Sequence, residues 1–395
     1  MLLVAVPAAV LALASACGSS GTKTAATGST PPGSGNAAST GAGSGGDSTL
    51  AGVQAVVSKA YQGTNVTPPV TPVTPKAGQK VWVISCGQAA LGCSAIADAA
   101  VAAGKRLGWT MTLYDGKLGV DNAYARGIKQ AVAAKADGII DGAIDCPLMK
   151  EPLAEAKTAG VKVVAVLAYD CSDPRFGGGP ALFTSNVIPN TGQQTTSAYA
   201  RQAGVLKAEW VLAQTKGKAV ALSLKHTDSL LGGDVAAGFD SRIKQCAACR
   251  VIDVPFTFAD ISNGQLGPKI SQALLANPTA NAVASPYDSL MLLGVAQAVA
   301  RSGRSAKIAS IGGEGLAPNL ALIANNQGED AATFEPDDWF GWAGVDTMVR
   351  TLAGQPAVPA GTGLQLIDKD HLPPATNGVI RTLDYQAAYL KAWGK

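Results

Sequence analysis

Five carboxylates stand at or just beyond the ends of short apolar runs in this sequence: Asp145, Asp170, Asp288, Glu314 and Glu335. Several carboxylates close to one ligand repel one another unless they accept hydrogen bonds or face a cation. If the fold gathers these groups, they form a markedly acidic cleft. Such a cleft predicts either a polyhydroxylated ligand with many hydrogen-bond donors or a ligand that bears an amine.

Aromatic and amide side chains occur at the same kind of position. Phe256, Phe258 and Tyr287 follow apolar runs, and Gln88 closes the Ser85-Cys-Gly-Gln88 segment after the first run. Aromatic faces beside hydrogen-bonding groups suit a small ligand with polar and apolar faces, such as a sugar or a polyol. Any one of these residues could instead be a turn or cap residue, so the prediction depends on their repetition.

Catalysis is not expected from this sequence. Its two histidines, His226 and His371, belong to no nucleophile or metal motif. Gly312-Gly-Glu-Gly315 resembles a phosphate loop, but it lacks the Lys-Ser/Thr pair of that motif and the spacing of the dinucleotide fingerprint. We therefore expect a binding protein without a cofactor or a metal site, rather than a secreted enzyme.

The segments that must position these residues alternate between two patterns. Short runs rich in Val, Ile and Ala predict strands, and the longer stretches between them have helical spacing, as in Ile96, Ala100, Ala103 and Leu107. Expected strands are 80–85, 110–114, 138–144, 162–167, 181–185, 218–224, 250–256, 281–284, 307–311 and 331–334. Strict alternation demands a mostly parallel sheet with helices on both faces. The strands are too many for one ordinary sheet, so we predict an α/β fold of two doubly wound lobes. Ligands bind outside the carboxyl ends of such strands.

The N-terminus has the pattern of an exported protein. Residues 2–16 are uncharged and almost wholly apolar, and about 15 residues are too short to cross a bilayer, so they predict a signal peptide. Ala14-Ser-Ala16 followed by Cys17 resembles a bacterial lipobox, in which the cysteine is lipidated. The alternative is an ordinary cleaved signal with a chance cysteine. Residues 18–78 are expected to be a flexible tether, with a short helix at 50–61 and an extended segment at 67–75, because Gly, Ser, Thr and Ala bury little surface.

Charge and hydropathy exclude other classes of partner. The net charge is only +3 and no basic block occurs, so nucleic-acid binding is not indicated. No other apolar segment is long and uninterrupted enough to span a membrane.

The cysteines also favour export. Of seven cysteines, six remain once Cys17 is set aside, and an even number is consistent with an oxidising compartment. Proximity in the sequence pairs Cys86 with Cys93, Cys146 with Cys171, and Cys246 with Cys249, although six cysteines allow fifteen connectivities. A zinc site at the last pair would need a second Cys or His pair, and a redox role does not fit its position between a helix and a strand.

Several short motifs in order carry a resemblance to a known family. They are Lys105-Arg-Leu-Gly-Trp109, Ala136-Asp-Gly-Ile-Ile140, Ala159-Gly-Val-Lys-Val-Val164, Ser185-Asn186, Ala237-Gly-Phe239 and Ser285-Pro-Tyr-Asp288. Over about Lys80 to Ile367, their order resembles the type I periplasmic binding proteins, specifically the ribose- and sugar-binding branch that serves ABC importers.

The resemblance implies an organisation and a function. Residues 1–17 would be the lipoprotein signal peptide and anchor cysteine, 79–185 plus 337–365 the N-terminal lobe, and 186–336 plus 366–395 the C-terminal lobe, joined by a multi-crossing hinge. The chain would capture a sugar or polyol, and present it to an ABC transporter permease while a lipid on Cys17 holds it at the outer face of the membrane. A sensory lipoprotein with the same fold is the alternative. A DNA-binding repressor is excluded by the signal segment and by the absence of a helix-turn-helix before Gly78.

The resemblance also implies the residues of the ligand site. They are Gln88, Asp145, Asp170, Asn186, Asp234, Phe256, Phe258, Tyr287, Asp288, Glu314, Glu335 and Trp339. Two arginines that commonly grip sugar hydroxyls in the family are missing, because Cys171 follows Asp170 and Gly233-Asp234 replaces the second. This departure keeps an amine-bearing or aromatic ligand as the alternative to a sugar. Trp339 and Trp342 would either cap the cleft or pack in the core.

Overall fold

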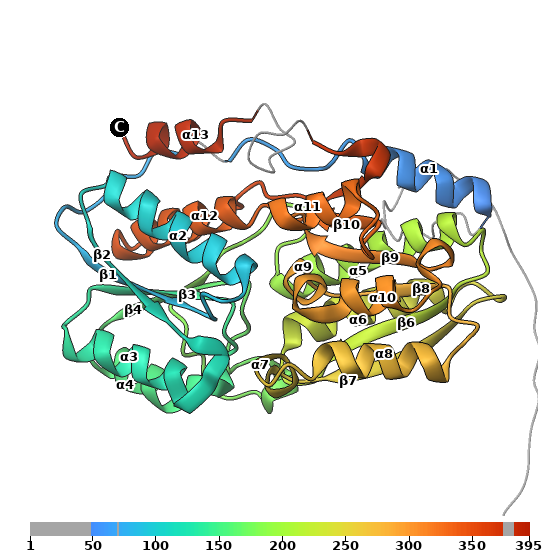
Figure 1. Ribbon diagram of the computed structural model, residues 1–395. Helices are drawn as coiled ribbons and strands as arrows, with labels where there is room; N and C mark the ends of the chain where they lie inside the picture. The colour runs from blue at the N-terminus through green and yellow to red at the C-terminus, as the bar shows by residue number, and fades with distance from the viewer. Residues whose placement is uncertain (1–48, 69–70, 374–382) are drawn as a thin grey trace, which may run out of the picture. The chain divides into compact units, whose positions relative to one another are not determined.

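The computed structural model describes residues 49–68, 71–373 and 383–395. Two β-sheets organise it, one built from residues 80–186 and the other from residues 220–368 (Figure 1). The predicted α/β class and the two doubly wound lobes are therefore confirmed. The first lobe is defined below as the first sheet with its covering helices, and the second lobe as the second sheet with its helices.

The first sheet has the order β2-β1-β3-β4-β5, and all of its neighbouring strands are parallel. Its strands are β1 (Lys80–Ser85), β2 (Thr110–Asp115), β3 (Gly138–Gly142), β4 (Lys162–Val166) and β5 (Ser185–Asn186). Its helices are α2 (Leu91–Arg106), α3 (Ala123–Ala133), α4 (Lys150–Thr158) and the later α12 (Asp337–Leu352). Residues of β3 and β4 are buried on both faces, one against α2 and α12 and the other against α3 and α4. Burial on both faces explains why these strands lack polar alternation.

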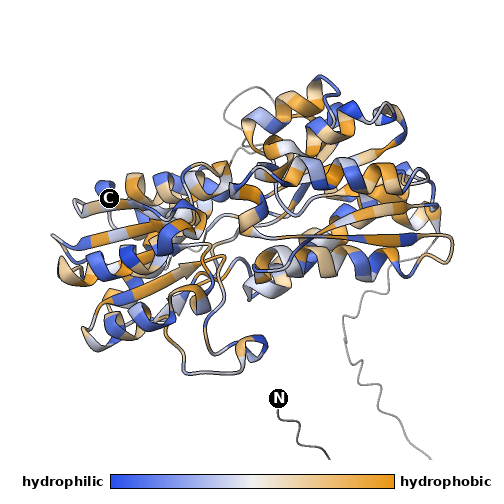
Figure 2. Cartoon of the chain, turned by 60° about the horizontal axis from the view of Figure 1, so that its bottom comes forward, coloured by the Kyte–Doolittle hydropathy of each residue, from blue (hydrophilic) through white to orange (hydrophobic). Residues whose placement is uncertain are grey.

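The second sheet has the order β11-β10-β9-β8-β6-β7, with only β11 antiparallel to its neighbour. Its strands are β6 (Val220–His226), β7 (Arg250–Phe256), β8 (Ala282–Ala284), β9 (Ala309–Glu314), β10 (Ala331–Phe334) and β11 (Gln365–Asp368). Its helices are α5 (Thr196–Gln214), α6 (Leu230–Ile243), α7 (Phe258–Ser262), α8 (Leu266–Ala276), α9 (Asp288–Leu290), α10 (Ala296–Arg301) and α11 (Ala317–Ala324). The expected single helix over 290–302 is instead interrupted by a π-turn at Met291–Val295, where Gly294 has a positive φ of 131°. Figure 2 shows the apolar residues concentrated in the strands and on the inward sides of the helices.

Between β1 and β11, the chain passes between the lobes three times. It leaves the first lobe after β5, returns after β10 to form α12, and leaves again after α12 to form β11. The first and third passages lie side by side, because Ala360 N–H donates to the Ile188 carbonyl (2.7 Å) and Thr362 N–H to the Pro189 carbonyl (3.0 Å). These hydrogen bonds join the passages into the multi-crossing hinge that the sequence resemblance implied.

The segment before β1 is packed on the lobes, unlike the flexible tether expected for 18–78. Helix α1 (Leu50–Ala60), close to the predicted 50–61, buries Val53 and Val57, which face α5 of the second lobe. Val73 N–H donates to the Ala392 carbonyl, and Trp109 of the first lobe donates from Nε1 to the Lys76 carbonyl (2.8 Å). The composition of this segment did not indicate buried contacts. It has them because two valines one helical turn apart pack together on the second lobe and because its backbone forms hydrogen bonds with distant parts of the chain. Residues 18–48 lie outside the described residues.

The C-terminal helix also differs from its expected place. Strand β11 joins the second sheet, but α13 (Tyr385–Ala392) contacts α12 of the first lobe. Its aromatic rings decide this position: Trp393 stacks on Trp342 at a centroid distance of 5.7 Å, and its Nε1 donates to the Asp346 carboxylate (2.8 Å). Residues 385–392, which the predicted boundary of 366–395 assigns to the second lobe, therefore contact the first lobe.

All three cysteine pairs expected from proximity are bonded. Disulfides join Cys86 to Cys93, Cys146 to Cys171, and Cys246 to Cys249. The first two fix the loops that follow β1, β3 and β4 of the first lobe. Within the described ranges, no helix has the length and hydropathy needed to cross a membrane.

Candidate functional site

A cavity lies between the two lobes, where the carboxyl ends of strands from both sheets face each other. Its lining includes Cys86 after β1 and Leu167 after β4 on the first lobe, and His226, Glu314 and Glu335 at the ends of β6, β9 and β10. This is the edge at which doubly wound sheets bind ligands. The cavity therefore lies at the edge of the sheets where the sequence predicts a ligand site.

The part of the wall formed by the loop after β1, α2 and Leu118 is apolar. The loop after β1 carries the Cys86–Cys93 disulfide, which lines the cavity with Ile96 of α2. Tyr124 of α3 donates its hydroxyl hydrogen to the Cys86 carbonyl (3.0 Å) and so holds this loop against the sheet. Leu118 extends the same wall.

The second-lobe wall contains an aromatic group centred on His226. Phe258 meets the His226 ring edge-on at 4.4 Å, and Tyr287 meets it at 5.9 Å, with its hydroxyl 3.3 Å from Ser229 Oγ. All four side chains line the cavity. Phe256 stacks behind His226 at 4.5 Å but is 1% exposed and belongs to the core, so the structure places it outside the cavity lining.

Asp288 and Glu314 support each other's loops. The Glu314 carboxylate accepts from the backbone N–H groups of Asp288 (3.1 Å) and Ser289 (3.2 Å). The Asp288 carboxylate accepts in turn from the N–H groups of Gly315 (2.7 Å) and Leu316 (2.9 Å). Burial, together with repulsion from the Asp288 charge, raises the pKa of Glu314, and burial raises that of Asp288. Only Glu314 reaches the cavity lining; Asp288 is wholly buried behind it.

Two further carboxyl groups enter the cavity from the passage between β10 and α12. Burial raises the pKa of Glu335 to about 7, and burial with repulsion from Glu314 raises that of Asp337 well above its ordinary value. The nearby ammonium of Lys207 is also buried and donates to the carbonyls of Pro286 and Gly312. Burial lowers the pKa of Lys207, although the surrounding carboxylates oppose that change.

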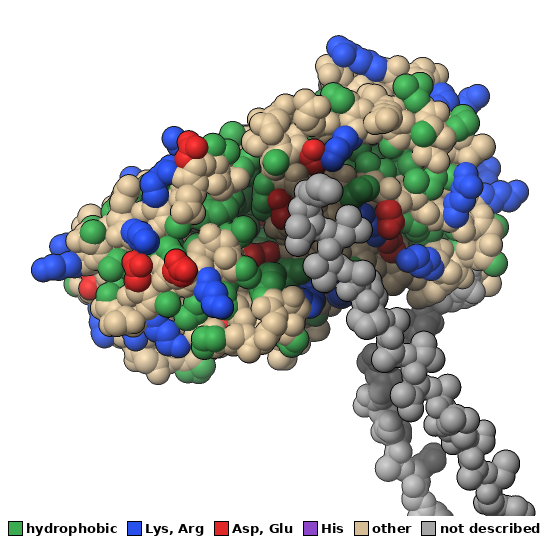
Figure 3. Space-filling model, turned by 90° about the horizontal axis from the view of Figure 1, so that it is seen from below, with side chains coloured by type: hydrophobic (Ala, Val, Ile, Leu, Met, Phe, Trp, Pro, Cys, Tyr) green, Lys and Arg blue, Asp and Glu red, His purple; other side chains and the backbone are tan. Residues whose placement is uncertain are grey.

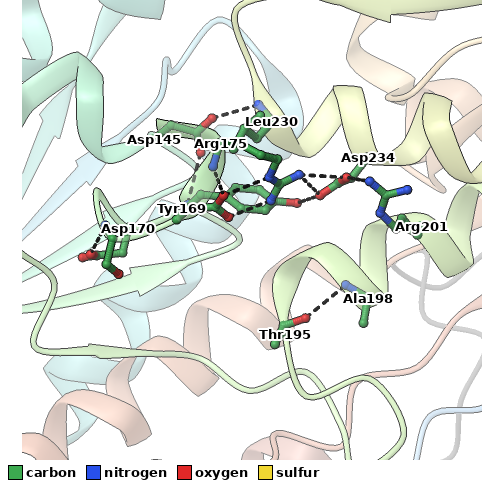
Figure 4. A network of polar contacts seen from close by, with 11 residues as sticks. Asp145, Tyr169, Asp170, Arg175, Thr195, Ala198, Arg201, Leu230 and Asp234 are labelled. Atoms are coloured by element: carbon green, nitrogen blue, oxygen red, sulfur yellow. Dashed lines mark hydrogen bonds and ion pairs between the residues drawn. The ribbon is translucent and has the colours of Figure 1, made fainter. Parts of the chain in front are cut away.

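Asp234 is part of an ionic contact between the lobes (Figure 4). Its carboxylate, 2% exposed, accepts from Tyr169 Oη (2.7 Å) and pairs with Arg175 (2.9 Å), both on the first lobe. Arg201 of α5 pairs with the other oxygen at 2.7 Å. The carboxylate is thus engaged by protein groups, so the structure places this predicted ligand residue in an interlobe contact rather than in the cavity lining.

Asp145 makes a second contact between the lobes. Its carboxylate accepts from Tyr169 N–H (3.1 Å) and from the N–H of Leu230, the first residue of α6 (2.9 Å; Figure 4). A carboxylate at a helix N-terminus is favoured by the unpaired N–H groups and by the helix dipole. Burial nevertheless raises the pKa of Asp145 to about 6, while these hydrogen bonds oppose the change.

The remaining predicted ligand residues lie away from the cavity lining. Asp170 accepts from the N–H groups of Leu182 and Phe183 and orders its own loop, beside Asn186 in a separate surface hollow. Gln88 donates its N–H to Asp115. Trp339 is buried, stacks on Tyr385 at 4.8 Å and donates to the Ala360 carbonyl, so its expected role as a ligand contact is corrected to core packing. Helix α13 packs against the face of α12 that carries Trp339 and Trp342, so core packing is the outcome of the two alternatives for these residues.

Three polar residues of this region are absent from the predicted ligand site. His226 ends β6 and so occupies the same kind of strand-end position as the predicted aromatic residues, which is a signal that the sequence contains. Asp337 lies two residues after Glu335. Arg175 lies five residues after Asp170, in a loop whose path the sequence does not reveal.

Basic side chains do not gather into one patch on the face shown in Figure 3, where Lys and Arg are spread over the surface. Among the residues that the structure describes, no group of three or more His, Cys, Asp or Glu is placed to hold a metal ion.

Comparisons with known proteins agree with this architecture. The family model described as "Periplasmic binding protein domain" matches residues 83–356. No curated protein sequence matches the chain.

Solved structures share the fold at low sequence identity. A glucose-galactose binding protein from Geobacillus stearothermophilus is 22% identical, with a TM-score of 0.64 over 76% of this chain and 100% of that chain. An ABC transporter solute binding protein from Mycobacterium smegmatis with bound glycerol is 20% identical, with a TM-score of 0.62 over 77% and 100% of the two chains. A solute binding protein from Agrobacterium vitis with bound allitol is 17% identical, with a TM-score of 0.59 over 74% and 96%.

Replacing Asp234 with Asn is expected to weaken the contact between the lobes. The substitution removes the charge that pairs with Arg175 and Arg201, so the population with separated lobes rises. Small-angle X-ray scattering should show a larger radius of gyration, and the affinity of a ligand that requires closure should fall roughly tenfold. Asp253→Asn removes an exposed ion pair with Lys225 within one lobe and should leave both measurements unchanged. An unaltered radius of gyration in Asp234→Asn would contradict this role.

The buried carboxyl groups predict a falling stability as pH rises. Folded Glu335 keeps its proton up to about pH 7, whereas an ordinary carboxyl group releases it near 4.5. The folded state therefore binds more protons between these values, and the free energy of unfolding should fall by up to roughly 3 kcal/mol from this group. Urea denaturation between pH 4.5 and 8 measures the slope. Glu335→Gln should flatten it, whereas Glu151→Gln on the exposed face of α4 should not; equal slopes in all three proteins would refute the prediction.

Proposed function

This chain belongs to the periplasmic binding protein domain family, and we propose that it is an extracytoplasmic solute-binding lipoprotein of an ABC importer. In this proposal it captures a small organic ligand between its lobes and presents the closed form to the permease. Membership of a binding-protein family agrees with the expectation that the chain is not an enzyme.

The observation that carries the proposal is the position of the cavity. Its walls come from both lobes, and Glu335 and Asp337 enter it directly from one of the passages between the lobes. A ligand held there contacts both lobes at once, so binding energy favours the closed arrangement. Rotation about a few residues in the passages is sufficient for opening and closure.

A sugar or polyol is the ligand class that the similar structures support. Two of them hold glycerol and allitol, and a third is a glucose-galactose binding protein. In this chain, the carboxyl groups of Glu314, Glu335 and Asp337 are hydrogen-bonding partners for hydroxyl groups, and the rings of Phe258 and Tyr287 offer apolar faces. The missing family arginines leave open which ligand of this kind it is.

Export and anchoring rest on different features. Three disulfides support an oxidising compartment, and the apolar segment before Cys17 supports export and lipidation. Cys17 lies outside the described residues, so the lipid anchor depends on the sequence pattern alone.

Native mass spectrometry of the freshly purified mature chain tests the ligand proposal. We expect a co-purified small molecule, or failing that a rise in melting temperature with a member of a panel of sugars, polyols, amines and aromatic acids. A ligand at 100 times its dissociation constant stabilises the folded state by about 2.7 kcal/mol. The matching scattering measurement should show a smaller radius of gyration with ligand. Absence of any bound molecule and of any stabilising compound would overturn the proposal.

Detergent phase partitioning tests the anchor. In a bacterium that processes lipoproteins, the intact chain should enter the detergent phase and incorporate labelled fatty acid, because the thiol of Cys17 is the acylation site in this proposal. Cys17→Ser should stay in the aqueous phase, whereas Ser20→Ala should behave as the intact chain. Partitioning of Cys17→Ser into detergent would show that the anchor is not at this residue.

A further inference from the structure

The cavity between the lobes is mostly apolar, which is unusual for a site that takes a hydroxylated ligand. The Cys86–Cys93 disulfide, Leu118 and Leu167 form one side, and Leu231, Leu290 and Leu293 contribute to the other. A sugar carries hydroxyl groups around its whole ring, and each one left against an apolar wall loses its hydrogen bonds to water. The walls therefore favour a ligand with an apolar body.

Besides His226 and Tyr287, the ionisable side chains of the described lining are three carboxyl groups: Glu314, Glu335 and Asp337. Two of them converge on one point, because a Cβ built on Gly92 of α2 would collide with Glu314 Oε1 and lie 3.2 Å from Asp337 Oδ2. The absence of a side chain at Gly92 lets both carboxyl groups approach the first-lobe wall. The polar groups thus occupy one part of the cavity.

One of these carboxyl groups has no protein partner on its inner oxygen. Asp337 is 5% exposed, and its Oδ2 atom is buried without a hydrogen bond. Buried polar atoms normally have partners, so an unpaired oxygen in the lining of a cavity points to a donor supplied by the ligand. Glu314, by contrast, has partners on one oxygen, because its Oε2 atom accepts from the backbone N–H groups of Asp288 and Ser289.

The charge of this group is not balanced by the cavity itself. None of the described lining residues is Lys or Arg. Lys207 is buried close to these carboxyl groups but does not line the cavity, and its ammonium donates hydrogen bonds to the carbonyls of Pro286 and Gly312. Burial raises the pKa values of Glu314, Glu335 and Asp337, and repulsion from neighbouring carboxylates adds to this change. The charge of Lys207 offsets it only in part at Glu314 and Glu335.

We infer that the ligand is a small organic amine, with its ammonium group between Asp337, Glu314 and Glu335 and its apolar ring or chain between the disulfide wall and Phe258. The inference rests on the proposed function, since it assigns a chemical class to the same interlobe site. An ammonium group donates hydrogen bonds, one of which can satisfy the unpaired Asp337 oxygen, and its positive charge is attracted to the three carboxyl groups. The rest of such an amine carries no hydroxyl groups that would lie against the leucines. Cation binding also requires the carboxyl groups to release the protons that burial favours.

Three matched pairs of probes test this class: phenethylamine and 2-phenylethanol, cyclohexylamine and cyclohexanol, hexylamine and 1-hexanol. Each pair shares an apolar body, so isothermal titration calorimetry isolates the ammonium. We expect at least one amine to bind at least tenfold more tightly than its alcohol. Amine affinity should rise between pH 5 and 8, and repeated titrations in buffers of different ionisation enthalpy should show proton release into the buffer.

Asp337→Asn should reduce amine affinity at least tenfold while leaving the alcohol unaffected, and Asp98→Asn on the exposed face of α2 should change neither. Circular dichroism and melting temperature verify that both variants are folded, and Glu335→Gln offers a second variant for the same comparison. The inference is overturned if no amine exceeds its alcohol. Binding and closure with D-allose or allitol under those conditions would leave the solute-binding function intact and assign the site to hydroxylated ligands. Failure of every probe and sugar would count against the proposed function as well.

Discussion

The paired passages between the lobes are the constraint on which the rest of the structure depends. Backbone hydrogen bonds from Ala360 and Thr362 to the segment at Ile188 and Pro189 tie the first passage to the third. The lobes therefore face each other through the carboxyl ends of their strands. A cavity, an acidic cluster and an ionic interlobe contact follow because all three are built from residues that leave those strand ends.

Buried charges in this arrangement are compensated to different degrees. Asp234 pairs with Arg175 across the interlobe boundary and with Arg201 within the second lobe. Asp145 accepts from one backbone N–H group of each lobe. The carboxyl groups of the cavity are compensated only in part. Burial raises the pKa of Asp145 to about 6, and it raises those of Glu335 and Glu314 further, to about 7 and about 8. The partners of a carboxylate thus distinguish the two groups. Asp145 and Asp234 are engaged by protein groups that join the lobes, whereas the cavity carboxyls lack such interlobe partners and line the cavity.

Segments on either side of the region that the family model matches, residues 83–356, also connect the lobes; the structure describes them at residues 49–68, 71–82, 357–373 and 383–395. The segment before β1 contacts the second lobe through α1 and the first lobe through Lys76, and Tyr61 donates to Asp368, the last residue of β11. The C-terminal segment runs from β11 to α13, which stacks its aromatic rings on α12. Both segments contact both lobes, so any rotation of the lobes must be accommodated by them.

The sequence by itself determined the α/β class, the two lobes and the edge of the sheets at which the cavity lies. Proximity along the chain indicated the disulfide pairs without excluding other connectivities. These features depend on hydrophobic periodicity and on short separations along the chain, which are local properties. Tertiary structure alone decided which polar residues face the cavity. The ion pair of Asp234 with Arg175 and the stacking of Trp339 on Tyr385 both join segments that are distant in the sequence. The same is true of Asp337, whose carboxyl group lies in the space left by the missing side chain of Gly92. A side chain at the end of a strand can point in several directions. Its direction is fixed by partners that the packing of the two lobes, of the described segment before β1 and of α13 brings beside it.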